Sequence, residues 1–381
     1  SVLSHIVSSQ AKLHAEFGGV VPNLAKREHQ KNLAPILLQA LTEAGSKSVK
    51  RKAQSTKPEI KTQKVERILE REPELLKRFK KSILPLPPPD IDAIAVTYGP
   101  GLAPCLWVGV NFARALAVLW GKPLIPVNHM AGHLFSALLQ ESRKENQLLV
   151  TSYQLPLIAL LVSGGHTELI LVNPHTKFGV GVKKPWRFQV IGETLDDAAG
   201  EAFDKVARIL GLGYPGGPEI SRLAERGDPT KYPLPSPMVN TQDYNFSFSG
   251  LKTAVLYLVR DVVSLASNMR EAKLTTSDKA DIAASFEKAA VEVLVKKTLR
   301  AAKEFKAKTV LLGGGVAANK KLRHDLLAAV NKELPSSKFQ APSPDLTGDN
   351  ALMIATAAYF TGKKKAPDKV GADANAALSS S

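Results

Sequence analysis

Two apolar runs, at residues 157–162 and 169–172, enclose the sequence Ser-Gly-Gly-His-Thr. Short apolar runs joined by a glycine-rich turn are typical of two antiparallel strands, so we predict a β-hairpin with a glycine tip. Glycine lets backbone N–H groups approach a phosphate closely because no side chain intervenes. Ser163, Gly164 and Gly165 therefore suit an anion site, although an ordinary tight hairpin uses the same residue types.

The wider pattern is an alternation of strands and helices, which predicts an α/β protein. From residue 90 onward, the predicted elements are strands at 93–98, 124–127 and 188–191, and helices at 107–119, 129–140, 196–210, 251–265, 278–305 and 350–360. The most apolar long stretch, 104–120, carries Asn111 and Arg114 in its middle, which a membrane span would tolerate poorly. We therefore expect a buried core helix there.

A second glycine cluster follows a predicted strand at residues 309–312 and precedes a helix. The N-terminus of a helix offers unpaired N–H donors and partial positive charge, so Gly313, Gly314 and Gly315 suit a nucleotide contact. The cluster lacks the Gly-Lys-Ser/Thr of a P-loop and the spacing of the dinucleotide fingerprint, so neither of those folds is indicated. Asn319 could bind a base or a ribose, or could be a polar helix residue.

Two histidines four residues apart, His129 and His133, lie on one face of the predicted helix at 129–140. They could bind one divalent ion, but the Glu of the protease pattern His-Glu-x-x-His is missing, and a polar helix start with satisfied histidines is the alternative. Asp349, at the head of the last predicted helix, could cap that helix or complete a site of two histidines and one carboxylate. Such a donor set suits iron, zinc or manganese.

An acidic stripe lies on the predicted helix at 196–210. Asp197, Glu201 and Asp204 recur at spacings of four and three, which is usually a solvated helix face. Here the helix is followed by Tyr-Pro-Gly-Gly-Pro at 214–218. A carboxylate beside a glycine turn can accept hydrogen bonds from ribose hydroxyls, so Asp204 is also a candidate nucleotide ligand.

The net charge of +16 in 381 residues favours a polyanionic partner. Half of that charge lies in residues 46–89, which hold 13 Lys and Arg against five Glu and end in Leu-Pro-Leu-Pro-Pro-Pro. We interpret this stretch as an insertion with a helix at 63–81 that Pro73 interrupts. Its charges contact nucleic acid or are simply solvated. The helix also has a partly apolar face, which is expected to dock part of it on the rest of the protein and consists of Val65, Ile68, Leu69, Leu76 and Phe79. The single cysteine, Cys105, excludes an intramolecular disulfide and fits a reducing compartment.

Nine short motifs occur in an order that identifies a family. They are Gly-Gly-Val-Val-Pro at 18–22, Tyr-Gly-Pro-Gly-Leu at 98–102, Val-Asn-His-Met-Ala-Gly-His at 127–133, Leu-Val-Ser-Gly-Gly-His-Thr at 161–167, Asp-Asp-Ala-Ala-Gly-Glu-Ala-Phe-Asp-Lys at 196–205, Tyr-Pro-Gly-Gly-Pro at 214–218, Phe-Ser-Phe-Ser-Gly-Leu-Lys-Thr at 246–253, Gly-Gly-Gly-Val-Ala-Ala-Asn at 313–319 and Thr-Gly-Asp-Asn at 347–350. The chain resembles the TsaD family of tRNA N6-adenosine threonylcarbamoyltransferases, formerly called O-sialoglycoprotein endopeptidases. The resemblance covers about residues 1–360 apart from the insertion.

The resemblance implies an actin, sugar-kinase and Hsp70-like fold, with two lobes of ribonuclease-H type and the nucleotide between them. The expected N-terminal lobe is 1–150, with the insertion at 46–89 and a returning helix at 341–362. The expected C-terminal lobe is 151–340. Residues 363–381, rich in Lys, Ala and Ser, are expected to be a disordered tail.

The resemblance also implies a reaction: transfer of a threonylcarbamoyl group from threonylcarbamoyl-adenylate to N6 of the adenosine just 3′ of the anticodon, in tRNAs that read ANN codons. It implies one divalent metal ion, iron first and zinc or manganese as alternatives, held by His129, His133 and Asp349. The implied adenylate contacts are Leu161, Val162, Ser163, Gly164, Gly165, Asp204, Gly217 and Asn319. No general base is assigned.

The implied partners are tRNA, a non-catalytic paralogue and a P-loop ATPase. No membrane partner is implied, and the expected location is the cytoplasm or the mitochondrial matrix. Family members begin with a strand, a phosphate loop and a second strand, and this chain starts after that hairpin. From this resemblance we expect either a fragment or a paralogue without turnover. Two other function classes are a non-catalytic nucleotide-binding scaffold and a metalloprotease. The missing Glu and the strand-flanked glycine clusters count against the protease.

Overall fold

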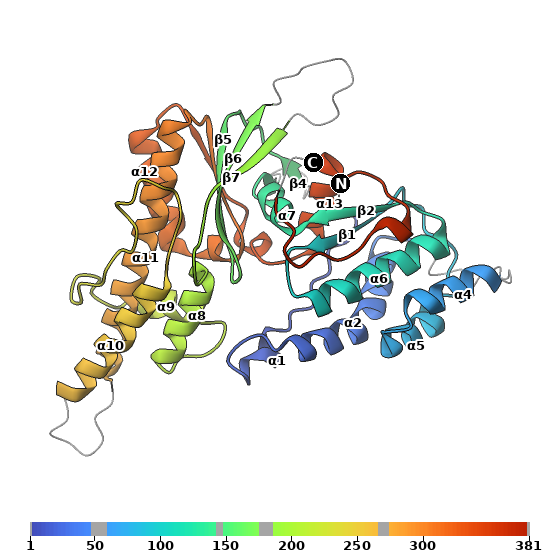
Figure 1. The fold of residues 1–381 in the computed structure, drawn as a ribbon, viewed down its shortest axis with the longest axis horizontal. Coiled ribbons are helices and arrows are strands. Elements are labelled where there is room, and N and C mark those ends of the chain that lie inside the picture. Colours follow the sequence, from blue (N-terminus) through green and yellow to red (C-terminus); the bar gives the residue numbers. More distant parts are fainter. Residues whose placement is uncertain (1, 47–58, 142–147, 175–185, 266–273, 379–381) are drawn as a thin grey trace.

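The predicted glycine-tipped hairpin is the centre of the larger of the two main sheets (Figure 1). The computed structural model describes residues 2–46, 59–141, 148–174, 186–265 and 274–378. Strands β5 (Leu157–Val162) and β6 (Thr167–Pro174) pair antiparallel. Strand β7 (Trp186–Glu193) continues antiparallel on one side, and β8 (Thr309–Gly313) and β9 (Lys338–Gln340) run parallel to β5 on the other. The order is β7-β6-β5-β8-β9.

Both faces of this sheet are buried, because alternate residues of β5 enter two different cores. Ile158, Leu160 and Val162 face one core, and their neighbours Leu157 and Ala159 face the other. Helices α8 (Ala199–Ile209), α9 (Gly216–Ala224), α10 (Ser249–Leu265), α11 (Thr276–Glu304) and α12 (Lys320–Glu333) contribute to the first core. Helices α7 (His129–Ser136) and α13 (Ala351–Thr361) contribute to the second.

A smaller sheet precedes the hairpin in the chain. Strands β1 (Ile94–Gly99) and β2 (Leu124–Asn128) pair parallel and are joined by α6 (Ala103–Trp120). Among the described residues, α6 is the one helix long and apolar enough to cross a membrane, and 61% of it is buried inside the protein. The prediction of a buried core helix is therefore confirmed. Short elements complete the structure: α1 (Ala11–Ala15), β3 (Leu139–Glu141), β4 (Leu148–Val150), η1 (Gly315–Ala318) and η2 (Pro344–Leu346).

The prediction that part of residues 46–89 docks on the rest of the protein is confirmed, and the alternative of a solvated stretch is wrong for the part that the structure describes. Helices α4 (Glu59–Ile68) and α5 (Pro73–Ser82) pack with α2 (Pro22–Glu43) on α6. Val65, Leu75 and Phe79 are fully buried there, because apolar residues recur on one face of each helix. The charges occupy the other faces. The predicted break at Pro73 is present, since α5 begins at that proline.

The prediction that residues 363–381 are disordered is wrong as far as residue 378. The backbone N–H of Lys365 donates to the carbonyl of Leu124, and that of Asp373 donates to the carbonyl of Tyr98, both at 2.8 Å. A short turn, η3 (Pro367–Lys369), lies between them. Val370 is only 4% exposed. The amino-acid composition of the tail does not predict this order, because backbone hydrogen bonds to β1 and β2 supply much of it.

The tail makes a measurable contribution to stability. Val370 packs against Val110, Ala113 and Leu124, so Val370→Ala removes two buried methyl groups. We expect a loss of about 1.5–2 kcal/mol in the free energy of unfolding, measured by denaturant titration. Lys369→Ala, at an exposed neighbouring position, is the control and changes stability by less than about 0.5 kcal/mol. Equal effects of the two substitutions would show that the tail does not pack.

Glu168 on β6 gives the fold a pH dependence. It lies opposite Glu193 on β7, and its Oε2 is buried without a hydrogen-bond partner. Burial raises the pKa of Glu168 from 4.5 to about 7, and the charge of Glu193 adds to that rise. The folded state therefore binds a proton that the unfolded chain releases. Stability is fully present below the unfolded pKa and is lost as pH rises through the folded pKa.

A Glu168→Gln variant isolates this effect. We expect the wild type to lose on the order of 2 kcal/mol more unfolding free energy than the variant between pH 5 and pH 8. Denaturant titration of both proteins at the two pH values measures the difference. A wild type and a variant that respond equally to pH would rule out a folded-state proton on Glu168.

Candidate metal centre and nucleotide site

The histidine pair is placed by the start of α7. Asn128, the last residue of β2, caps the helix: its Oδ1 accepts hydrogen bonds from the backbone N–H of Met130 at 2.9 Å and of Ala131 at 3.3 Å. His129 is therefore the first helical residue, and His133 lies one turn later on the same face. The ring centroids are 4.7 Å apart. His133 is fully buried, whereas 19% of the His129 side chain is exposed.

The third predicted ligand, Asp349, comes from the loop before α13. The N-cap of this helix is Asn350, whose Oδ1 accepts a hydrogen bond from the backbone N–H of Met353 at 2.9 Å. The alternative in which Asp349 caps the helix is therefore wrong, and its carboxylate is free to face the histidines. A Cβ on Gly132 of α7 would lie 2.9 Å from Cδ1 of Ile354, so glycine allows α13 to approach this closely.

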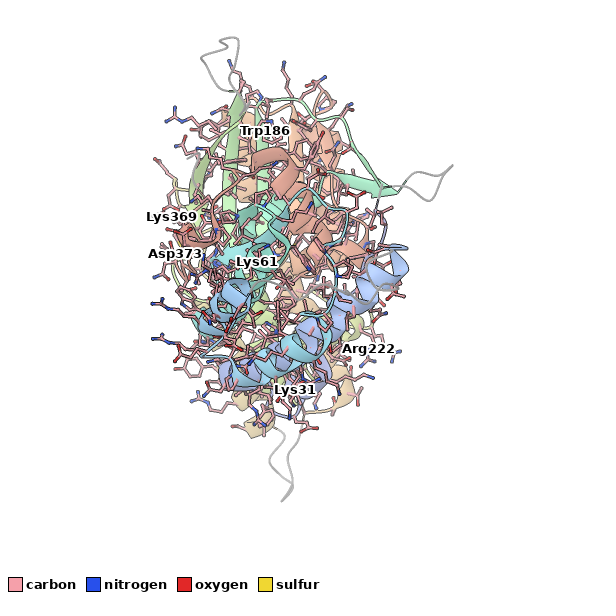
Figure 2. All side chains as sticks on the ribbon, turned by 90° about the vertical axis from the view of Figure 1, so that its right-hand side faces the viewer. Lys31, Lys61, Trp186, Arg222, Lys369 and Asp373 are labelled. Carbon is pink, nitrogen blue, oxygen red and sulfur yellow. The ribbon has the colours of Figure 1, made fainter. Side chains whose placement is uncertain are left out.

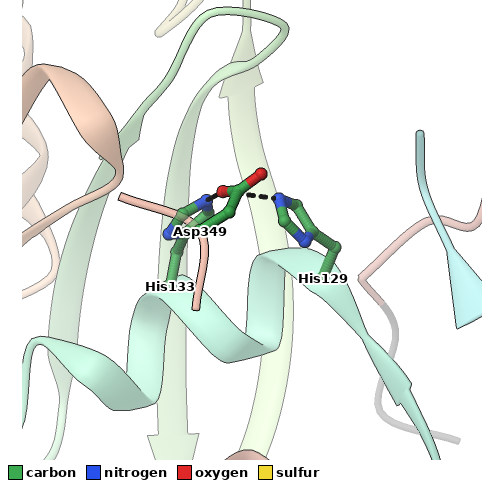
Figure 3. Close-up of side chains that lie close together, drawn as sticks. All are labelled: His129, His133 and Asp349. Carbon is green, nitrogen blue, oxygen red and sulfur yellow. Dashed lines mark ion pairs between the residues drawn. The ribbon is translucent and has the colours of Figure 1, made fainter. Parts of the chain in front are cut away.

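Figure 3 shows the carboxylate between the two imidazole rings. Asp349 Oδ1 lies 3.3 Å from Nε2 of His129 and 3.3 Å from Nε2 of His133. Two ligands that are each about 2.1 Å from one ion, at a tetrahedral angle, lie about 3.4 Å apart. Among the described residues, this is the one group of three histidine, cysteine or acidic side chains that could hold a metal ion.

The chemistry of the three donors also fits a divalent ion. Both ring nitrogens of His133 are buried without a well-formed hydrogen bond, so Nε2 lacks a partner that an ion would supply. Although many protein atoms surround Asp349, 74% of its side chain is open to solvent. Burial acts to raise its pKa, but interaction with the nearby imidazoles of His129 and His133 outweighs burial and holds the pKa well below its usual range. The carboxylate is therefore a ready anionic ligand.

The glycine tip of the hairpin lies beside this centre. The backbone N–H of Ser163 donates to the carbonyl of His166 at 2.8 Å, and this bond closes the turn. Burial lowers the pKa of His166, and Coulombic interaction with the nearby His129 and His133 lowers it further. The end of β8 joins the hairpin to α7: a Cβ on Gly313 would lie 2.8 Å from Cδ2 of Leu161 and 2.9 Å from the carbonyl oxygen of His133.

The predicted adenylate contacts on the hairpin divide into two kinds. Leu161 and Val162 are fully buried, with their side chains in the two cores, so they can offer a ligand only backbone groups. Gly164 and Gly165 are exposed, and Ser163 is half-buried. The second glycine cluster is next to them: Gly314 has φ +87°, and a Cβ there would lie 2.3 Å from the carbonyl oxygen of Val162.

Asp204 lies on α8, and the start of this helix is attached to the hairpin. The backbone N–H of Ala199 donates to Oγ1 of Thr167 at 2.9 Å, which fixes the start of α8 on β6. One carboxylate oxygen of Asp204 then accepts the backbone N–H of Gly216 at 2.6 Å, at the start of α9. Burial raises the pKa of Asp204, and the backbone N–H groups of Gly216 and Gly217 partly offset that rise.

The other two members of the acidic stripe have a different role. Lys205 Nζ lies 2.6 Å from a carboxylate oxygen of Asp197 and 3.0 Å from one of Glu201. Lys252 also pairs with Asp197 at 3.1 Å. Asp197 and Glu201 therefore form ion pairs within the protein. Of the three acidic residues, only Asp204 lies at the glycine turn.

Asn319 is buried, with 8% exposed, and its side chain is fully engaged. Its Oδ1 caps α12 by accepting the backbone N–H of Leu322 at 2.8 Å. Its Nδ2 donates to Oε1 of Glu287 at 2.7 Å and to Oγ of Ser221 at 2.9 Å. Asn319 therefore ties α12 to α9 and α11 and fixes the end of the second glycine cluster.

Several residues that position this site were not singled out from the sequence. Asn128 and Asn350 follow the N-cap preference, which was a usable signal because each immediately precedes a predicted helix. Thr167 and Gly132 gave no such signal. Their importance depends on which helix packs against them.

Comparison with known proteins agrees with the motifs. The sequence matches the family described as "TsaD: tRNA N6-adenosine threonylcarbamoyltransferase" over residues 1–53 and 66–356. Proteins named tRNA N6-adenosine threonylcarbamoyltransferase are 42% identical in Thermosipho africanus, over 95% of this chain and 88% of the relative, and 41% identical in Thermomicrobium roseum, over 99% and 90%. The protein of that name from Ralstonia pickettii is 42% identical over 93% and 83%.

A solved structure described as "Crystal structure of T.kodakarensis HypF" gives a TM-score of 0.45 at 14% identity and covers 77% of this chain and 42% of that one. Similarity at this level does not establish a shared fold. The sequence match, by contrast, leaves out only 54–65 and the residues after 356. The chain belongs to the TsaD family of tRNA N6-adenosine threonylcarbamoyltransferases.

Proposed function

We propose that this chain transfers a threonylcarbamoyl group from threonylcarbamoyl-adenylate to N6 of the adenosine just 3′ of the anticodon in tRNAs that read ANN codons. Membership of the family supports the reaction. The observation that supports its location is the packing of α7, which carries His129 and His133, against β5 of the glycine-tipped hairpin and against Gly313. We propose this junction as the place where the acyl donor is held.

The chemistry requires positioning more than a strong catalyst. The adenine amine is a weak nucleophile, but the donor is a mixed anhydride with a good leaving group. The N6–C bond forms, the bond between the carbamoyl carbon and the phosphate oxygen breaks, AMP leaves, and N6 loses a proton. Exposed N–H groups at Gly164 and Gly165 can donate to oxygen atoms of the donor, since no side chain covers them.

The remaining contacts follow from the same arrangement. Asp204 and Gly217 lie at the start of α9, where a carboxylate and backbone N–H groups can hold ribose hydroxyls. Asn319 holds the second glycine cluster in place through α12. When bound to the two histidines and Asp349, a divalent ion would offset negative charge on the donor phosphate. We propose iron for this ion, and the same donors also suit zinc or manganese.

We also propose a two-lobe organisation, a cellular location and partners for the protein. The mixed five-stranded sheet supports a C-terminal lobe of ribonuclease-H type at 151–340. The packing of α13 on β1, β2 and α7 supports its return, within 341–362, to an N-terminal lobe at 1–150. We further propose that the protein acts in the cytoplasm, or in the mitochondrial matrix, together with a non-catalytic paralogue and a P-loop ATPase.

The metal centre is tested by conservative substitution. Asp349→Asn and His129→Gln each remove one donor while keeping the size of the side chain. We expect metal binding to weaken on the order of 100-fold, because loss of a direct ligand costs at least as much as loss of its supporting partner. Metal content after dialysis against iron or zinc is the first measurement, and transfer of labelled threonylcarbamoyl to tRNA is the second.

Asp345→Asn is the matched control, since Asp345 is an exposed acidic residue four positions before Asp349. It should retain both metal and transfer. Full metal content in Asp349→Asn would exclude the three-ligand centre. If Asp349→Asn and His129→Gln both keep full metal content and normal transfer, these residues have no role in the proposed reaction.

The nucleotide site is tested separately with AMP as the probe. Asp204→Asn removes the charge that faces the start of α9. We expect AMP to bind about tenfold more weakly, which corresponds to about 1.4 kcal/mol. Glu201→Gln, one turn earlier on α8, should bind AMP as the wild type does. Calorimetric titration measures both, and an unchanged affinity in Asp204→Asn would place the ribose elsewhere.

A further inference from the structure

A lysine-lined hollow of about 530 Å³ lies between α4, the end of α6 and the residues that follow α13. Twelve residues line it, and five of them are lysines, while none is acidic. The lysines are Lys61, Lys64, Lys122, Lys364 and Lys365. The other lining side chains are small or apolar, and they include neither an arginine nor an aromatic ring.

Three segments from different parts of the chain form this hollow. Lys61 on α4 reaches the end of α6, where its Nζ lies 3.5 Å from the carbonyl oxygen of Leu119. Lys122 lies two residues after Trp120, the last residue of that helix. Lys365 is fixed at the start of β2 by two backbone hydrogen bonds with Leu124, of 2.8 and 3.2 Å. The lysines are therefore held together by the fold, although they are far apart in the sequence.

The positive charge of the hollow is not neutralised by the protein. Within the described residues, none of the five lysines forms an ion pair. Glu66, on the same helix as Lys64, pairs instead with Lys80 at 2.5 Å. The carbonyl groups at the end of α6 offset the charge only in part, because a helix terminus carries about half an elementary charge. Such a surface attracts polyanions.

Four of the five lysines lie outside the part of the chain that matches the family. Lys61 and Lys64 lie in 54–65, and Lys364 and Lys365 lie after 356, which are the segments left out of the match. The face shown in Figure 2 carries Lys61 from one of these segments and Lys369 from the other. Two segments that have no counterpart in the family match thus meet at one basic surface.

The position of the hollow relative to the metal centre suits one long ligand. Strand β2 begins at Leu124, beside the hollow, and ends at Asn128, beside His129. At about 3.3 Å per residue, the two ends are separated by roughly 13–17 Å. A few nucleotides of RNA span that distance.

We infer that this hollow binds the phosphate backbone of tRNA away from the adenosine that is modified. The inference rests on the proposed function, because tRNA is the substrate there. Lysine binds phosphate as a point charge, and without aromatic or arginine side chains the hollow offers no surface for stacking or for bidentate recognition of bases. Binding at this surface is therefore independent of sequence and sensitive to salt.

The test variant is the triple substitution Lys64→Gln, Lys364→Gln and Lys365→Gln, at three exposed positions. Fluorescence anisotropy measures the Kd of labelled tRNA for the full chain between about 50 and 300 mM salt. We expect the Kd to rise about tenfold at the lower salt concentrations, and the slope of log Kd against log salt to fall by about 2, because three phosphate contacts are lost. The corresponding triple substitution to Arg should bind tRNA as tightly as the wild type.

The control is Lys288→Gln, Lys308→Gln and Lys332→Gln, which removes the same charge from exposed positions elsewhere on the chain. Equal losses in the control and the test variant would overturn the inference, since they would show only the effect of net charge. Unchanged tRNA binding in a folded test variant would also overturn it and would leave an acidic polypeptide as the occupant. A wild type that binds tRNA but does not modify it contradicts the proposed function alone.

Discussion

The close packing of α13 against α7 at Gly132 is the contact on which the candidate site depends. The three donors come from two helix starts at distant points of the chain, and they meet only if α13 lies near enough for Asp349 to reach between His129 and His133. A side chain at Gly132 would meet Ile354 within about 3 Å. The same two helices also cover one face of the five-stranded sheet, so the contact that assembles the donors is part of the core and is stabilised by its burial.

The arrangement of charge around this contact separates two kinds of ligand group. The two histidines hold the pKa of the Asp349 carboxyl well below its usual range, whereas burial and the same histidines lower the pKa of His166 on the hairpin. The tip itself presents exposed backbone at Gly164 and Gly165. An anionic donor that bridges the two places would meet positive charge at the metal centre and hydrogen-bond donors at the tip. That division is typical of sites that orient a phosphate and leave the adjacent carbonyl accessible.

The sequence predicted the elements that have strong local signals: the hairpin around Ser-Gly-Gly, the helix that carries the histidine pair and the core helix at 103–120 are confirmed. It did not show whether Asp349 or Asn350 caps α13, because both residue types favour that position and only packing on α7 decides the register. The apolar face that docks α4 and α5 was visible in the sequence, whereas the tail was misjudged because backbone hydrogen bonds supply much of its order. Asn319 was recognised as important, but its engagement with Glu287 depends on tertiary contacts.

The tail connects the metal centre with the lysine-lined hollow. Near the start of β2, Lys365 exchanges backbone hydrogen bonds with Leu124. At the end of β2, Asn128 uses its Oδ1 to cap α7 and its Nδ2 to donate to the carbonyl groups of Ala376 and Ala377. One segment thus holds both ends of the strand that leads to His129. A polyanion bound at the hollow would be held at a fixed distance from the metal ligands, because the strand between them is paired along its length with β1 and cannot shift without breaking these bonds.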